Sequence, residues 1–88
     1  MTHEQEVMRG HDAARILNEP LYQEAFSLVE EGIIRAMKNS GMGDESTHNR
    51  LVIALQVLDK VQKHLKEVME TGKMAEIQVN KKKFGIFG

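Results

Sequence analysis

The sequence predicts an all-α fold: an antiparallel helical hairpin with a shorter N-terminal helix, assembled into an oligomeric helical bundle. Three observations lead to this prediction. Residues 50–69 repeat apolar side chains at the alternating spacings of three and four that mark a helix packed on another helix. Residues 20–39 carry a second, broad apolar stripe of helical period. Between them, NSGMGDES holds two glycines and several capping residues, the composition of a loop that joins antiparallel helices.

The shorter N-terminal helix is expected over residues 3–18. Its apolar positions recur at helical spacing, its first turn is acidic and Arg15 lies near its end, an order that suits the helix dipole. Gly10 interrupts this pattern at a cost of about 1 kcal/mol relative to alanine. Pro20 disfavours helical geometry at the residue before it, so a break or sharp bend is expected near residues 18–19.

The helix over about 45–70 is the element on which the others are expected to pack. Its first half is apolar on several sides, and an 88-residue chain has little else with which to cover it. We therefore expect self-association through this helix, chiefly its 51–57 half. The expected oligomer interface consists of Leu51, Val52, Ala54, Leu55, Leu58, Val61 and Leu65.

The sequence leaves the end of this helix open. Gly72 offers a C-terminal stop, but the apolar pattern continues beyond it, and the short alternation IQVN also allows an extended segment. Continuation to about residue 78 is slightly favoured. A single helical domain is accordingly expected over residues 1–79, followed by a flexible basic and aromatic tail over 80–88.

Composition narrows the class of protein. Twelve basic and 13 acidic residues give a net charge of −1, so no overall basic excess recruits nucleic acid. The absence of cysteine excludes disulfides and is compatible with a reducing cytosol. No membrane partner is expected, because the longest apolar run, Leu51–Leu55, is far shorter than the ~20 residues of a membrane span. The polar start of the chain does not resemble a signal peptide, and a cytoplasmic location is expected.

The C-terminal tail is the segment that the sequence most clearly displays. Its two phenylalanines suit docking into a pocket on a larger protein partner. A basic run beside aromatic residues also suits phosphate binding and base stacking, although three lysines give weak, salt-dependent affinity. A solubilising tail whose aromatics fold back on the bundle is the third interpretation. The residues concerned are Lys81, Lys82, Lys83, Phe84, Ile86 and Phe87.

No catalytic residue and no cofactor are expected. The serines stand in no nucleophile-elbow pattern, and the chain has no cysteine. A single Glu-x-x-His spacing, Glu45–His48, matches the ligand spacing of ferritin-like metal bundles. One copy of this motif requires two or more chains to build a metal site, and a solvated helix start is the stronger interpretation, since Glu45 there suits the helix dipole.

Two segments carry a resemblance to a known group of proteins. ARILNEPLYQEAF in residues 14–26 and LKEVMETGKMAE in residues 65–76 resemble short uncharacterised helical proteins encoded in tailed-bacteriophage genomes. The likeness covers about residues 7–78, and its motifs are helix-packing features without chemistry. It implies a phage protein of the head-assembly or DNA-packaging region, located in the host cytoplasm or the virion, and it carries over no catalytic residue.

These observations give one leading function and two alternatives. The leading prediction is a non-enzymatic, phage-type structural or assembly protein that forms a homo-oligomer and docks on a larger protein through its tail. The first alternative is a nucleic-acid-binding accessory that acts through the basic tail. The second is a metal site of the ferritin-like kind, assembled across subunits.

Overall fold

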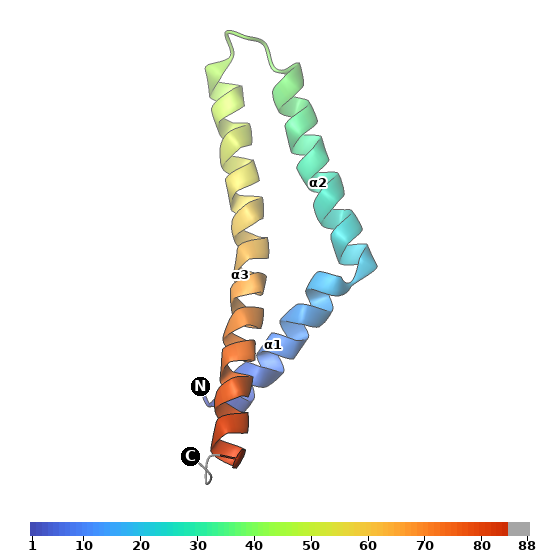
Figure 1. The fold of residues 1–88 in the computed structure, drawn as a ribbon. Coiled ribbons are helices and arrows are strands. Elements are labelled where there is room, and N and C mark those ends of the chain that lie inside the picture. Colours follow the sequence, from blue (N-terminus) through green and yellow to red (C-terminus); the bar gives the residue numbers. More distant parts are fainter. Residues whose placement is uncertain (85–88) are drawn as a thin grey trace.

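The computed structural model describes the backbone of residues 1–84 and the side chains of residues 1–81. Three helices account for nearly all of it: α1 (His3–Asn18), α2 (Pro20–Asn39) and α3 (Glu45–Phe84) (Figure 1). No strand occurs within the described residues. The prediction of an all-α chain is therefore confirmed.

Local sequence signals explain where the helices begin. Thr2 caps α1 in a capping box, in which its hydroxyl accepts a hydrogen bond from the Gln5 backbone at 3.2 Å and the Gln5 side chain accepts one from the Thr2 backbone at 2.9 Å. Glu19 is extended, with φ −70° and ψ 122°, and Pro20 opens α2, so the predicted break is confirmed. Asp44 precedes α3 and accepts a hydrogen bond from the Thr47 backbone at 3.1 Å.

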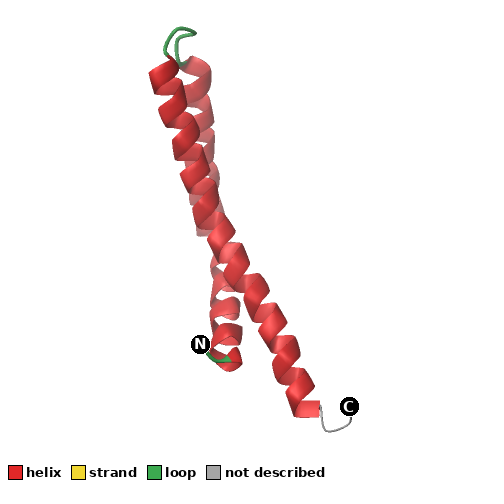
Figure 2. Cartoon of the chain, turned by 90° about the vertical axis from the view of Figure 1, so that its left-hand side faces the viewer, coloured by secondary structure: helices red, strands yellow, loops and turns green. Residues whose placement is uncertain are grey.

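The three helices form an elongated molecule with extents of 66 × 24 × 18 Å. α2 and α3 extend from their connecting loop to the same side, so the chain runs toward the loop in α2 and away from it in α3, and before the bend at Glu19 α1 crosses α3 (Figure 1). Figure 2, turned by 90°, shows α3 as one long helix with α2 beside its first half and α1 beside its second half. α1 and α2, joined by the bend at Glu19, thus both lie along α3, and we call this pair of helices the bent arm.

α1 and α3 touch through their backbones at two glycines. A Cβ added at Gly10 would lie 2.7 Å from the Cα of Gly72, and a Cβ added at Gly72 would lie 2.6 Å from the Cα of Gly10. Such distances are shorter than real Cβ contacts, so only glycine fits at this crossing. Ala13 and Ala75, each three residues further along its helix, are 3% exposed. Small residues therefore let the two helices pack without intervening side chains.

The crossing explains why α3 does not stop at Gly72. The helical penalty of glycine is offset by the close packing that its missing side chain allows. A stop at Gly72 and an extended IQVN segment, both left open by the sequence, are wrong. α3 also runs six residues beyond the favoured end at residue 78, so positions 80–84, expected in the tail, have helical backbone.

The chain buries few large side chains. No large side chain among the described residues is fully buried, and the buried hydrophobic residues are Ala13 and Ala75. The accessible surface is 6987 Å² for a mass of 10.0 kDa. A compact globular chain of this mass exposes about 5,200 Å², so this molecule exposes about 1,700 Å² more. One copy therefore forms an extended arrangement of helices without a closed core.

Candidate interaction surfaces

Most of the predicted oligomer interface faces the chain's own helices. Its residues lie on the first half and middle of α3, and Leu51, Val52, Ala54, Leu55, Leu58 and Leu65 are half-buried there. Val61 differs, since 55% of its surface is exposed. We call the six half-buried residues the inner seam of α3. Val61 is the one residue of the predicted interface that the chain leaves uncovered.

The inner seam of α3 is matched by a half-buried stripe on α2. Tyr22, Phe26, Ile33 and Met37 follow one another at spacings of four, seven and four, so they share one face of α2. The rings of Tyr22 and Phe26 lie 6.2 Å apart between centroids. The Tyr22 hydroxyl is buried and has no hydrogen-bond partner among the described residues. Within one chain, this stripe supplies half-buried apolar residues on α2, and the inner seam supplies them on α3.

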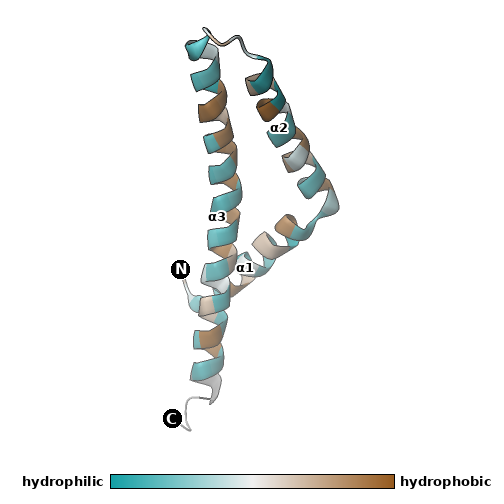
Figure 3. Cartoon of the chain, turned by 45° about the horizontal axis from the view of Figure 1, so that its top comes forward, coloured by the Kyte–Doolittle hydropathy of each residue, from teal (hydrophilic) through white to brown (hydrophobic). Residues whose placement is uncertain are grey.

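Each of these two helices also carries a second apolar stripe that the chain leaves open. On α2 it consists of Leu21, Ala25 and Leu28, with Gly32 at its end, at spacings of four, three and four. A Cβ at Gly32 would meet nothing within 4 Å, so no described part of the chain approaches it. On α3 the stripe consists of Ile53, Val57 and Val61 at spacings of four. The five large residues are between 55% and 68% exposed. Figure 3 shows apolar residues recurring along α2 and along the half of α3 that follows the loop.

The two open stripes lie on the same side of the α2 and α3 pair. Successive residues turn by about 100° around a helix. On both α2 and α3, this places the open stripe roughly 100–120° around the helix axis from the half-buried stripe. Viewed along the chain direction, the rotation has the same sense on both helices. α2 and α3 run in opposite directions (Figure 1). Equal rotations about two facing antiparallel axes bring both stripes to one side. We call this surface the outer face: Leu21, Ala25, Leu28, Gly32, Ile53, Val57 and Val61.

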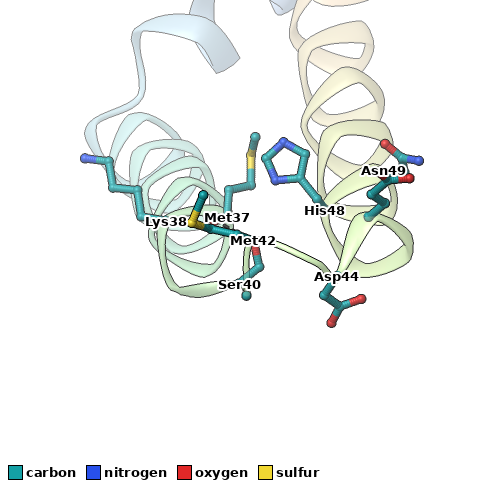
Figure 4. A pocket seen from close by; sticks show the side chains of 9 residues that line it. Met37, Lys38, Ser40, Met42, Asp44, His48 and Asn49 are labelled. Carbon is teal, nitrogen blue, oxygen red and sulfur yellow. Dashed lines mark hydrogen bonds between the residues drawn. The ribbon is translucent and has the colours of Figure 1, made fainter.

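The loop end of the molecule carries an open recess. Its lining includes Met37, Met42, Asp44 and His48, and Figure 4 shows the side chains of Met37 and His48 pointing toward each other between the helices, whereas Asp44 points away. Hydrogen bonds from the Thr47 side chain and backbone lower the pKa of Asp44, which is fully exposed. The recess combines capping groups with the thioethers of Met37 and Met42.

The Glu-x-x-His motif stands at the start of α3, as expected. Glu45 and His48 are both exposed there. Within the described part of the chain, no group of three or more His, Cys, Asp or Glu side chains gathers in a way that could hold a metal ion. A centre built on this motif would still need ligands from further chains.

The predicted tail lies only partly within the described residues. Lys81 is exposed in the last turns of α3. Lys82, Lys83 and Phe84 continue the helical backbone, and Ile86 and Phe87 lie outside the described residues. A role of this segment in binding protein or nucleic acid therefore stays a prediction.

Two features of the structure were not predicted from the sequence, although each has a signal in it. The Gly-x-x-Ala spacing occurs at Gly10–Ala13 and again at Gly72–Ala75, which marks two helix faces of small residues. The outer stripes were visible as apolar positions beyond the seams, but only the structure separates covered from uncovered ones.

None of the helices, over the residues that the structure describes, has an apolar stretch long enough to cross a membrane. No family model, curated protein or solved structure matches this chain.

Proposed function

We propose that this chain is a non-enzymatic structural or assembly module whose folded form is a self-associated helical bundle, with α2 and α3 as its antiparallel hairpin. One observation carries the proposal: no large side chain in the described residues is fully buried, although 41% of the sequence is hydrophobic. Small chains bury a limited share of their surface, and disulfides, metals or association are the usual aids to their stability. This chain has no cysteine for a disulfide, which favours association.

The magnitude of uncovered surface supports association. A standard interface buries about 800 Å² per copy, of which roughly 65% is apolar in homodimers, and this would contribute about 13 kcal/mol per copy before the costs of ordering and association are subtracted. Those costs are of similar size, so the net gain is a modest fraction of it. A net gain of a few kcal/mol is nevertheless a substantial fraction of the roughly 5–15 kcal/mol that typically separates folded from unfolded domains.

The setting of this module is proposed from the sequence. Its resemblance to short helical proteins of tailed phages favours a place in head assembly or DNA packaging. The basic and aromatic segment from Lys81 to Phe87 would then dock a larger protein of that assembly. Lys81 lies 36 residues after Glu45, the first residue of α3 (81 − 45 = 36), so the described start of this segment and the loop lie at opposite ends of α3 (Figure 1).

The test is the concentration dependence of thermal unfolding. If association stabilises the folded state, the midpoint of helix loss measured by circular dichroism rises as the protein concentration increases from 1 to 100 μM. A midpoint that stays constant over this range contradicts the proposal. A truncation at residue 79 serves as the companion, because the proposal expects it to keep the concentration dependence and lose only partner docking.

A further inference from the structure

We propose that the outer face binds a second copy of this chain, with α2 of each copy lying antiparallel over α3 of the other. This inference rests on the proposed function and specifies its contact surface. It moves the main interface from the inner seam of α3 to the side of the molecule where both stripes are open. In the resulting dimer, the α2 and α3 helices of the two copies form two stacked layers of two helices each. α1 of each copy lies beside the second half of its own α3.

The geometry of the outer face suits a helical partner. Its stripe on α2 has the spacings of four, three and four that form the seam of a packed helix pair. Gly32 lies in that seam with open space around it, so a neighbouring helix can approach closely. Two parallel stripes on adjacent helices present a broad apolar surface, and the same surface on a second copy is its natural complement.

The area available agrees with a dimer. Each copy exposes about 1,700 Å² more than a compact chain of its mass. A standard stable interface buries about 800 Å² on each partner. One such interface therefore fits within the surplus of a single copy, without any rearrangement of the helices.

Charges beside the stripes favour one pairing of helices. Glu24 lies along the edge of the α2 stripe, whereas Lys60 lies along the corresponding edge of the α3 stripe. Nearer the loop both helices carry an arginine beside the stripe, Arg35 on α2 and Arg50 on α3. The ion pairs between described side chains are His11–Glu76, Asp12–Arg15 and Glu70–Lys73, so none of them engages these four charges. Stacking α2 of one copy on α3 of the other brings the opposite charges of Glu24 and Lys60 together.

The register brings these opposite charges level. Met37 of α2 and His48 of α3 line the same recess beside the loop. Counting twelve residues from the loop along both helices places Lys60 level with Ala25, next to Glu24. A two-fold axis along the bundle keeps those levels, so Lys60 of one copy meets Glu24 of the other, and the contact occurs twice in a dimer.

The first experiment is sedimentation equilibrium of outer-face variants. Ile53→Glu places a charge in the face, and Ile77→Glu is its matched control, because both isoleucines lie on α3 and are 57% and 59% exposed. We expect the wild-type chain to be dimeric, Ile53→Glu to raise the dissociation constant at least about a hundredfold, and Ile77→Glu to change it less than about threefold. Circular dichroism at high protein concentration verifies that both variants are helical.

The second experiment is a charge-exchange cycle, which leaves the apolar surface intact. Glu24→Lys and Lys60→Glu are each expected to raise the dissociation constant by about three- to tenfold, since each ion pair occurs twice, and the double variant is expected to restore it. Single variants without effect, or a double variant that is the weakest of the three, would overturn the α2-over-α3 arrangement.

Cysteine cross-linking gives an independent test of the same arrangement, since the chain has no cysteine of its own. An oxidised mixture of Ala25→Cys and Val61→Cys chains is expected to give the mixed disulfide as its main product. A predominant Ala25→Cys homodimer contradicts the arrangement.

The outcomes separate this inference from the proposed function. A wild-type chain that is monomeric at 100 μM overturns both. A wild-type oligomer whose mass is unchanged by Ile53→Glu overturns the outer face alone, and self-association would then belong to the inner seam around Leu58.

Discussion

Replacing Gly72 by alanine tests the backbone contact that joins α1 to α3. In an isolated helix this change is stabilising by about 1 kcal/mol, because alanine has the higher helix propensity. Here the added Cβ would lie 2.6 Å from the Cα of Gly10 and 2.9 Å from the carbonyl oxygen of Glu6. Both are backbone atoms, so neither can swing aside. We therefore expect the sign of the effect to be reversed.

The size of the effect follows from the displacement that is needed. Ordinary contact begins at 3.4 Å, so the two backbones must separate by about 0.8 Å. That movement loosens the packing around Ala13 and Ala75, which are the buried hydrophobic residues of the crossing. Overpacking of this kind costs about 1–3 kcal/mol, and subtracting the helix-propensity gain of about 1 kcal/mol leaves a net loss of about 0–2 kcal/mol.

The assay is urea unfolding followed by circular dichroism at fixed protein concentration. Thr71→Ala is the matched control, because Thr71 is the neighbouring residue of α3 and is exposed. It is expected to be neutral or stabilising by a few tenths of a kcal/mol, in line with helix propensity. If Gly72→Ala is more stable than wild type, as helix propensity alone would make it, the close crossing of α1 and α3 is refuted.

Three further predictions concern the helix starts and the inner seam. Thr2→Ala removes the capping box of α1 and is expected to cost about 1 kcal/mol in urea unfolding; an unchanged midpoint would contradict the cap. The Asp44 carboxylate has a lowered pKa in the folded state, so its stabilising contribution is present above its ordinary pKa of 3.8 and is lost as the pH falls further, through the folded value. Asp44→Asn is accordingly expected to flatten the dependence of the unfolding midpoint between pH 5 and pH 2, and an identical pH profile would contradict this. Leu58→Ala, at the half-buried seam, is expected to cost about 1–2 kcal/mol, whereas exposed Lys63→Ala is expected to stay within about 0.5 kcal/mol, and equal thermal midpoints would contradict the seam.

Local signals in the sequence were sufficient to predict the elements of the fold. Pro20 determines the break after α1, because its ring restricts the preceding residue regardless of tertiary contacts. Asp44 likewise marks the start of α3 through a hydrogen bond to a residue three positions away. Such features depend on neighbours in the chain, and sequence patterns report them directly.

The path of α3 beyond Gly72 could not be predicted in the same way. The balance at this glycine depends on Gly10, 62 positions earlier, and on the direction from which α1 approaches. The separation of the apolar residues of α3 into an inner seam and an open stripe has the same origin. Ala54 and Val57 are both apolar and only three residues apart, yet the first is half-buried and the second is exposed, because only one of them faces the bent arm of α1 and α2.

We propose that one copy of this chain is an incomplete bundle and that copies associate to complete it. Light scattering coupled to size-exclusion chromatography, at 0.1 M and 1 M NaCl, tests it most directly. We expect a discrete species of twice the 10.0 kDa chain mass at both salt concentrations, because apolar contacts are not screened by salt. A single 10.0 kDa species at both salt concentrations and at tens of micromolar protein would contradict it.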